Sequence, residues 1–224
     1  MSEAVRDMFT NLANNYDLTN DIFSFGMHRS WKTKAIKYAE IKENERVLDI
    51  ATGTGDLAIE ISKSHPKSEV IGLDFSSGML DVARKRTDNS IEFIEGDALD
   101  LPFDDNSINK CFISYGIRNV DSTEKCLKEI YRILKPNGKI VILETGTPTG
   151  IVYFFYRLYT RFGLPLLGKF LTKDKASYKY LAETANNYPF GKKFVDIFKN
   201  SANFQKVESK RLFFGSSYIY IGTK

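Results

Sequence analysis

The sequence has few of the residues that build disulfide frameworks and zinc sites. It contains two cysteines and two histidines among 224 residues. Cys111 lies in an apolar run and Cys126 in a stretch with helical spacing, so we expect both to be small core side chains. The two histidines, His28 and His65, are far apart in the chain. These absences exclude a disulfide framework, make a dedicated metal site unexpected and fit a reducing cytoplasm.

Long apolar runs and an excess of one charge are missing as well. No run approaches the roughly 18 uncharged apolar residues of a membrane span. The first residues, MSEAVRDMFTNL, lack the basic-then-apolar layout of a secretory signal. The 32 Lys and Arg residues are scattered among 28 Asp and Glu residues, so no nucleic-acid partner is expected. A net charge of +4 is still compatible with weak attraction to anionic membrane surfaces.

Short β-branched runs alternate with helical stretches through the middle of the chain. The pattern predicts strands at residues 46–50, 69–74, 91–95, 111–115 and 139–144, and helices at residues 56–64, 76–86 and 122–134. The last of these helices meets a stop signal, Pro136-Asn137-Gly138. Helical spacing also predicts helices at residues 3–16, 30–39, 178–186 and 190–200. Strands alternating with helices predict an α/β fold with right-handed crossovers and a doubly wound, mostly parallel sheet.

The end of the chain predicts a different strand arrangement. Two strand-like runs, at residues 204–214 and 216–224, are joined by a short loop. We expect them to close the sheet as an antiparallel pair, which gives seven strands in all. One domain is expected over residues 1–224. Its predicted parts are an N-terminal helical cap (1–40), a cofactor-binding core (45–145), a helical substrate cover (146–189), and a helix with a strand pair (190–224).

A glycine-containing turn follows the first predicted strand. Gly53 and Gly55 fit a dinucleotide fingerprint, which by itself is compatible with either NAD or S-adenosylmethionine. Asp49 precedes the glycines and Asp56 follows them. Carboxylates at this turn would oppose a pyrophosphate, which needs bare amides and positive potential. S-adenosylmethionine carries a cationic sulfonium and an ammonium instead, so the acidic turn favours this cofactor.

Acidic residues also follow the next two predicted strands. Asp74 ends the strand at residues 69–74, where a carboxylate can accept both ribose hydroxyls. Asp97 and Ala98 follow the strand at residues 91–95, where an acid and a backbone amide can hold the adenine edge. Open α/β sheets bind ligands at the carboxyl ends of their strands. Taken singly, Asp49 or Asp97 could be a turn cap, but the set together predicts a cofactor site.

Longer segments resemble one group of class I methyltransferases. Residues 16–31 (YDLTNDIFSFGMHRSW) are similar to the N-terminal signature of the quinone-biosynthesis C-methyltransferases, the demethylmenaquinone and 2-polyprenyl-6-methoxybenzoquinol methylases. Residues 132–145 (RILKPNGKIVILET) resemble their second signature, and residues 114–120 (SYGIRNV) the segment after strand four. The likeness continues at residues 178–183 and 202–204, so it spans nearly the whole chain.

The resemblance implies an S-adenosylmethionine-dependent enzyme and names further site residues. Its implied cofactor contacts are Thr54, Asp74, Asp97, Ala98 and Ser114. The residues themselves independently support Asp49, Asp74, Asp97 and the turn of Gly53 and Gly55. No metal is required for methyl transfer from a sulfonium.

The expected reaction is C-methylation of a polyprenylated quinol in menaquinone or ubiquinone biosynthesis, demethylmenaquinol to menaquinol. Arg118 is expected to hold the developing phenolate, because an arginine does not give up its proton at neutral pH. Asn119 is expected to orient the ring, and His28, with Tyr16, to accept the proton. The alternatives are a surface salt bridge for Arg118, a turn cap for Asn119 and a structural role for His28.

An aromatic-rich stretch at residues 151–171 includes Phe154 and Phe155. It is expected to be either a helix packed on the core or an apolar cover that receives the polyprenyl tail and contacts lipid headgroups. A peripheral position at the inner face of the membrane and a homodimer are further expectations. Three other functions remain open: a methyltransferase for another small molecule, an NAD-dependent oxidoreductase, and a cofactor-binding partner subunit without turnover.

Overall fold

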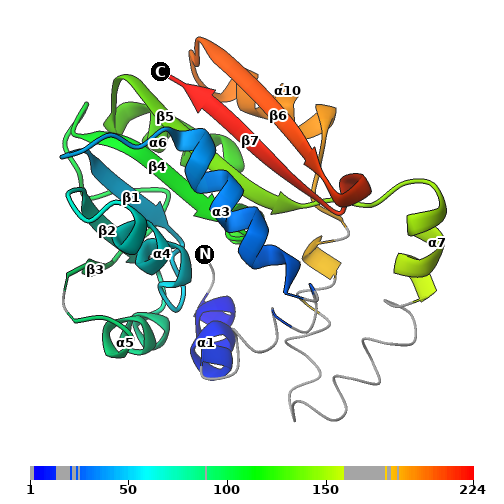
Figure 1. The fold of residues 1–224 in the computed structure, drawn as a ribbon, viewed down its shortest axis with the longest axis horizontal. Coiled ribbons are helices and arrows are strands. Elements are labelled where there is room, and N and C mark those ends of the chain that lie inside the picture. The colour runs from blue at the N-terminus through cyan, green and yellow to red at the C-terminus, as the bar shows by residue number, and fades with distance from the viewer. Residues whose placement is uncertain are drawn as a thin grey trace.

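The computed structural model describes residues 3–13, 21, 24, 26–88, 90–158, 180, 183–185 and 187–224. Its strands are β1 (Arg46–Ile50), β2 (Glu69–Asp74), β3 (Glu92–Glu95), β4 (Ile108–Ser114), β5 (Leu134–Thr145), β6 (Lys206–Leu212) and β7 (Ser217–Thr223). Within the described ranges they form one seven-stranded sheet in the order β3-β2-β1-β4-β5-β7-β6 (Figure 1).

The sheet is mostly parallel. β1 to β5 pair in parallel, and β7 runs antiparallel between β5 and β6. β1 and β4 are neighbours, so the strand order reverses between them. Open α/β sheets bind ligands at such a reversal. The predicted fold class, a doubly wound, mostly parallel sheet with an antiparallel C-terminal strand, is confirmed.

Helices cover both faces of the sheet (Figure 1). One face carries α3 (Met27–Ala39), α4 (Asp56–Ser64) and α5 (Ser77–Lys85), and the other carries α6 (Thr123–Ile133) and α10 (Lys192–Ser201). Successive strand residues point to opposite faces of the sheet. Val47 packs in the core under α3, α4 and α5, and Leu48 packs in the core under α6 and α10. Because both faces are buried, the central strands are continuous apolar runs in the sequence.

Residues just before the helices set where three of them begin. The hydroxyls of Ser76 and Ser122 accept backbone N–H groups from the first turns of α5 and α6, at 3.3 and 3.2 Å. These serines are therefore N-caps rather than the first helical residues. α3 begins at Met27, earlier than the predicted Ser30, and the preceding Gly26 has a φ of 71°. This left-handed conformation is easily reached only by glycine.

β5 begins earlier than the sequence predicts. α6 passes directly into β5, so the strand starts before the predicted range 139–144. Pro136-Asn137-Gly138 therefore lies inside the strand, where Asn137 has a φ of 64° and donates its N–H to the Lys224 carbonyl (2.9 Å). The pairing with β4 shifts register between Ile108 and Lys110. The extra pairing also explains why β4 starts at Ile108 and not at the predicted Cys111.

The N-terminal helix α1 (Glu3–Leu12) packs on α5. Phe9 and Met79 share a small buried cluster, and the Thr10 hydroxyl lies 2.8 Å from the Ser76 hydroxyl. α1 therefore lies against the end of the sheet that carries the carboxyl ends of β1 and β2. The rest of the predicted helix 3–16, at residues 14–16, lies outside the described residues.

α7 (Ile151–Leu158) follows β5 and begins next to the β6–β7 turn, η4 (Phe213–Gly215). The N–H of Thr149 donates to the Phe214 carbonyl at 3.0 Å. Residues 159–179, and parts of the predicted helix 178–186, lie outside the described residues. None of the helices in the described ranges has the length and hydropathy needed to cross a bilayer.

Candidate functional site

A cleft opens at the carboxyl ends of β1, β2 and β4. Its lining includes four predicted site residues, Gly53, Asp74, Ser114 and Asn119. Further lining comes from residues that sequence reasoning missed: Arg6, Phe9, Ala51, Ser76, Met79, Tyr115 and Gly116. Arg6 and Phe9 belong to α1, so the N-terminal helix forms one wall of the cleft. Its amphipathic pattern predicted the helix, but no local signal indicated where the helix docks.

The chain turns sharply where β1 and β4 end. Ala51 and Tyr115 have φ values of 54° and 57°, in the left-handed region. Such conformations cost about 1–3 kcal/mol each for residues other than glycine and gather at functional sites. Gly116 allows the two turns to meet, because a Cβ there would lie 2.6 Å from the Ala51 Cβ. The two strands therefore end in turns that pack closely against each other, and residues of both turns line the cleft.

The two glycines of the predicted turn have different tasks. Gly55 has a φ of 78°, and a Cβ there would lie 3.0 Å from both Ala83 and Phe93. Gly53 has a φ of 57° with open space around its Cβ position, and its N–H donates to Asp74 Oδ2 at 2.7 Å. Gly55 thus permits close packing of the turn on the protein, whereas Gly53 leaves room for a ligand to approach the backbone.

Asp49 is a buried carboxylate with spare bonding capacity. Asp49 is 1% exposed, and its Oδ2 accepts a hydrogen bond from the Thr52 hydroxyl at 2.6 Å. Oδ1 is buried and has no hydrogen-bond partner among the described residues. Burial raises the pKa of Asp49 to about 7, against the lowering effects of the Thr52 hydrogen bond and of Lys32. An added cation with N–H donors would satisfy Oδ1 and favour the ionised carboxylate.

Asp74 joins the glycine turn to the start of α5. Its two oxygens accept the backbone N–H groups of Gly53 (2.7 Å) and Ser76 (2.9 Å). Burial raises the pKa of this carboxyl, while the backbone hydrogen bonds act in the opposite direction. Each carboxylate oxygen has two acceptor positions, so both oxygens keep capacity for a ligand hydroxyl. Asp74 can therefore hold the turn and bind a diol at the same time.

The structure corrects the expectation for Asp56. This carboxylate lies 2.7 Å from the Lys32 ammonium and 3.3 Å from the Arg86 guanidinium. Burial acts to raise the pKa of Asp56, but Lys32 and Arg86 hold it below its usual value. Its charge therefore balances two cations of the protein and is not reserved for a cationic ligand. The Arg86 guanidinium also donates a hydrogen bond to the Thr54 carbonyl at 2.9 Å, which stabilises the glycine turn.

Five predicted cofactor residues are outside the lining of the cleft: Asp49, Thr54, Gly55, Asp97 and Ala98. Thr54 is 2% exposed and follows Gly53. Asp97 and Ala98 follow β3, and Asp97 Oδ1 accepts the N–H of Leu99 at 3.0 Å. Asp97 thus caps its own turn, which was the alternative interpretation, and a ligand role for Asp97 stays a prediction. The cofactor contacts of these residues stay predictions.

A buried ion pair lies at the carboxyl ends of β4 and β5. Arg118 Nη1 lies 2.6 Å from Glu144 Oε1, with side chains only 8% and 1% exposed. This arrangement differs from the surface salt bridge that was the alternative for Arg118. The neighbouring Asn119 lines the cleft, and its Oδ1 is buried without a hydrogen-bond partner among the described residues. Sequence reasoning missed Glu144, although a charged residue at the end of the apolar run KIVILE was a usable signal.

His28 lies in a different polar cluster from Arg118. Its Nδ1 is 2.6 Å from the Ser24 hydroxyl and its Nε2 is 3.9 Å from Asp21. Burial lowers the pKa of His28, with a further contribution from the Lys32 charge. A lowered pKa keeps the imidazole neutral at pH 7, which a proton acceptor requires. Its predicted partner Tyr16 lies outside the described residues, so the catalytic roles of both stay predictions.

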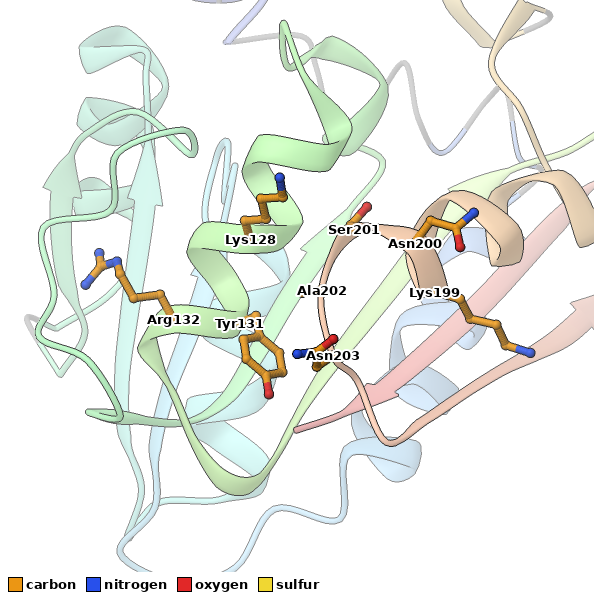
Figure 2. A pocket seen from close by; sticks show the side chains of 8 residues that line it. All are labelled: Lys128, Tyr131, Arg132, Lys199, Asn200, Ser201, Ala202 and Asn203. Atoms are coloured by element: carbon orange, nitrogen blue, oxygen red, sulfur yellow. The ribbon is translucent and has the colours of Figure 1, made fainter.

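A larger open hollow of about 380 Å³ lies elsewhere, between α6 and α10 (Figure 2). Lys128, Tyr131 and Arg132 come from α6, and residues 199–203 come from the end of α10 and the loop after it. The Arg132 guanidinium is already bonded to Glu129 and Asp105. This hollow is at the start of β5, away from the strand ends that carry Asp49 and Asp74. The described residues hold no cluster of three or more His, Cys, Asp or Glu side chains arranged for a metal ion.

Solved structures with a similar fold are methyltransferases. An S-adenosylmethionine-dependent methyltransferase from Thermotoga maritima matches with a TM-score of 0.68 and 23% identity, covering 97% of this chain and 98% of that chain. Phosphoethanolamine N-methyltransferase 2 of Haemonchus contortus, in complex with S-adenosylhomocysteine, matches with a TM-score of 0.65 and 19% identity, covering 87% and 52%. At these identities the likeness establishes the fold.

Sequence relatives are more similar. Demethylmenaquinone methyltransferase of Staphylococcus carnosus is 40% identical over 226 residues, which covers 99% of this chain and 93% of that protein. The ubiquinone/menaquinone biosynthesis C-methyltransferase of Bdellovibrio bacteriovorus is 40% identical over 225 residues, covering 99% and 96%. A family model described as the ubiE/COQ5 methyltransferase family matches residues 1–224. The resemblance predicted from the sequence is confirmed, and the chain belongs to the ubiE/COQ5 methyltransferase family.

Proposed function

We propose that this protein transfers a methyl group from S-adenosylmethionine to a ring carbon of a polyprenylated quinol, demethylmenaquinol to menaquinol. The observation that carries the proposal is the cleft lined by Gly53 and Asp74, together with the unpartnered oxygen of Asp49, which is buried beside the glycine turn. The relatives named for demethylmenaquinone support this substrate, and the Bdellovibrio relative keeps a ubiquinone precursor as the second candidate.

The residues at the ends of β1, β2 and β4 fit S-adenosylmethionine. Asp49 Oδ1 suits the ammonium, and the Asp74 carboxylate suits the ribose hydroxyls. Ser114 adds a buried hydroxyl oxygen without a hydrogen-bond partner among the described residues. Gly53 lets the ligand approach the backbone closely. The bound cofactor supplies the electrophilic methyl group, and the protein holds it in line with the ring carbon and excludes water.

The substrate side of the proposed site centres on Arg118 and Asn119. The Arg118 guanidinium stabilises negative charge that develops on the quinol oxygen. Asn119, which lines the cleft, orients the ring. Residues 1–40 and 146–189 serve as the cap and the substrate cover around the core of residues 45–145, and residues 190–224 complete the sheet. His28 and Tyr16 are retained as partners in proton transfer.

A surface rich in exposed apolar side chains supports peripheral contact with the membrane. We define this aromatic patch as Tyr153, Phe154 and Leu158 of α7 with Phe213 and Phe214 of η4, which are 43–62% exposed. The N–H of Thr149, two residues before α7, donates to the Phe214 carbonyl, so the start of α7 lies near η4. Amphipathic aromatic surfaces of this kind bind at the headgroup boundary of bilayers. A long-tailed quinol would then reach the site from the lipid phase.

Methyl transfer from labelled S-adenosylmethionine tests the proposal directly. The protein is incubated anaerobically with demethylmenaquinol, with a polyprenyl methoxybenzoquinol, and with a tail-free naphthoquinol. We expect the fastest transfer to demethylmenaquinol. Binding of S-adenosylmethionine without transfer to any quinol would instead support a partner subunit lacking turnover. Preferential binding of NADH would support an oxidoreductase, and sedimentation of the same preparation tests the homodimer.

A further inference from the structure

Glu144 carries a buried oxygen without a donor. Its Oε1 accepts three hydrogen bonds, from Arg118 Nη1 (2.6 Å), the Thr145 N–H (2.6 Å) and the Thr145 hydroxyl (3.0 Å). Oε2 is buried and has no hydrogen-bond partner among the described residues. A buried acceptor left without a donor is rare in folded proteins and calls for an explanation. The carboxylate is thus fixed firmly by one oxygen, while the other is left available.

The nearby phenols do not fill this position. The Tyr188 hydroxyl lies 2.8 Å from the Thr123 hydroxyl, and the Tyr220 hydroxyl accepts the Gly191 N–H at 2.7 Å. Burial raises the pKa values of both tyrosines, and the Glu144 charge adds to the effect. Both phenols therefore stay protonated and remain bonded to other groups. Neither phenol therefore supplies the donor for Glu144 Oε2, and a ligand hydroxyl can take this place.

A second open acceptor belongs to the residue that follows Arg118, the ion-pair partner of Glu144. Asn119, next to Arg118, lines the cleft with a buried Oδ1 that also lacks a partner among the described residues. A quinol offers two O–H donors, whereas the oxidised quinone offers acceptors alone. Two open acceptors, one on the ion-pair partner of Arg118 and one on the residue that follows Arg118, therefore match the reduced ring.

We propose that Glu144 is the catalytic base of the reaction: its Oε2 takes the proton of the quinol hydroxyl next to the methylated carbon. The inference rests on the proposed function and assigns its proton acceptor to the strand end of β5. Arg118 then acts as the cation that holds the quinol oxygen, and Glu144 keeps the guanidinium in place through Oε1.

The proton and electron balance is simple. The ring carbon bonds to the methyl group, and the cofactor sulfur keeps the electron pair of the broken bond. The hydroxyl proton passes to Glu144 Oε2, which leaves a ring ketone and a tetrahedral ring carbon. Water then takes the hydrogen of that carbon as a proton, and Glu144 returns its proton to the oxygen. The products are the methylated quinol, the thioether and one proton in solvent.

The ion pair also lowers the electrostatic free-energy cost of this proton transfer. Proton transfer moves one negative charge from Glu144 to the quinol oxygen. Arg118 is adjacent to Glu144, which carries this charge before the transfer. The total charge of the buried cluster does not change. Methyl transfer then cancels this negative charge against the positive charge of the sulfonium, so the net charge of the cluster and the cofactor together is the same before and after the step. As the new bond forms, the ring hydroxyl becomes more acidic, so a carboxylate is basic enough.

The decisive variant is Glu144→Gln, which keeps the size of the side chain and an oxygen for Arg118. We expect a loss of about 100-fold or more in the single-turnover rate at neutral pH, as for removal of a general base. Affinity for S-adenosylmethionine should stay unchanged. The defect should shrink as the pH approaches about 10, where phenols ionise without help. Glu129→Gln, which alters the partly buried Glu129–Arg132 pair on α6, is the matched control.

A second readout needs no turnover and uses the unaltered protein first. Without S-adenosylmethionine, a tail-free naphthoquinol should bind about tenfold more tightly than the naphthoquinone, as expected for a charged hydrogen bond. Glu144→Gln should remove this preference. Equal binding of quinol and quinone to the unaltered protein would overturn the proposal even if the variant failed to fold.

Other outcomes are equally clear. A defect in Glu144→Gln that is the same at every pH would make Glu144 only a positioning residue for Arg118 and reject it as the base. A pH-linked defect in His28→Asn and none in Glu144→Gln would transfer the role to His28. If the unaltered protein methylates no quinol, the proposed function fails first, so the two failures are distinguishable.

Discussion

The cofactor side and the substrate side of the cleft are built by different means. At the ends of β1 and β2, backbone geometry dominates: the Asp74 carboxylate accepts the N–H of Gly53 in a left-handed glycine turn and the N–H of Ser76 before α5. At the ends of β4 and β5, the main feature is the buried Arg118–Glu144 side-chain pair. The first arrangement depends on backbone groups bound to one carboxylate, and the second on two oppositely charged side chains. The cofactor side should therefore be sensitive to added atoms, and the substrate side to unbalanced charge.

The largest effect is expected at the substrate side. Arg118→Ala leaves Glu144 buried without its cation, which typically costs about 3–5 kcal/mol of stability. The double change Arg118→Met with Glu144→Leu removes both charges and should recover most of that loss. Neither variant should turn over quinol, while affinity for S-adenosylmethionine stays nearly constant in any folded variant. Urea unfolding and calorimetry check this. Equal stabilities for the single and double variants would contradict the buried pair.

A matched pair of substitutions tests the cofactor side. Gly55→Ala adds a Cβ 3.0 Å from Ala83 and Phe93 at a φ of 78°. We expect a loss of about 2–5 kcal/mol, from the left-handed conformation and the overpacking together. Gly53→Ala meets no neighbour within 4 Å, so only the conformational cost of about 1–2 kcal/mol should remain.

The effects of these two variants on cofactor affinity should have the opposite order to their effects on stability. Gly53→Ala should weaken S-adenosylmethionine binding more than its small effect on unfolding suggests, because its Cβ occupies ligand space. Thermal unfolding with and without the cofactor measures both effects. A Gly53→Ala protein with normal cofactor affinity would exclude close approach of the ligand to this turn.

Cofactor affinity should depend on pH through Asp49. Its pKa is raised by burial to about 7, so the carboxyl loses its charge as the pH falls below that value. Affinity for the cationic cofactor should therefore fall by up to about tenfold per pH unit below 7, and binding near pH 7 should release a proton. Asp49→Asn should abolish the dependence. A wild-type affinity that is flat between about pH 6 and about pH 8 would contradict the assigned contact.

The raised pKa of Asp49 also makes the stability of the ligand-free protein depend on pH. A raised pKa means that the folded state binds the proton more tightly than the unfolded state. The stability that Asp49 contributes is then complete below the unfolded pKa and is lost as the pH rises through about 7. Unfolding of the ligand-free protein across this range should show the loss, and Asp49→Asn should not.

The smallest effect is expected at the aromatic patch, outside both sides of the cleft. Replacing Phe213 and Phe214 by Ser removes two exposed rings, which are 48% and 59% exposed. Liposome association should weaken about fivefold in all, at about 0.5 kcal/mol per partly inserted ring. Turnover of a tail-free quinol should be unchanged. Tyr38→Ser, an exposed aromatic on α3, is the control, and an equal effect of both changes would contradict a membrane role for the patch.

Local patterns were enough to predict the cofactor side. β1, β2 and α4 lie at the predicted bounds, because buried strands and an amphipathic helix leave short-range signals. Gly53 and Gly55 lie in the turn that follows β1. Asp74 ends β2, the strand that pairs with β1. Asp56 shows the limit of such reasoning. Its neighbours in sequence suggested a free carboxylate, whereas the fold brings Lys32 and Arg86 to it.

The substrate side depends on sheet order, which local patterns do not determine. Arg118 and Glu144 meet because β4 and β5 are neighbours, and their pairing has no period in the sequence. The early start of β5 was missed for a related reason. Pro136-Asn137-Gly138 resembles a turn, but the Lys224 carbonyl and the neighbouring β4 keep this segment in the sheet. Long-range pairing overrides the local stop signal.

The most direct test of the account is to find where the methyl group goes. S-adenosylmethionine labelled with carbon-13 in its methyl group is turned over with demethylmenaquinol under anaerobic conditions, and the product is examined by NMR. The account predicts a methyl group bonded to the ring carbon next to a hydroxyl, formed by the unaltered protein and strongly reduced in Glu144→Gln. A methyl group on oxygen, or no labelled quinol at all, would contradict it.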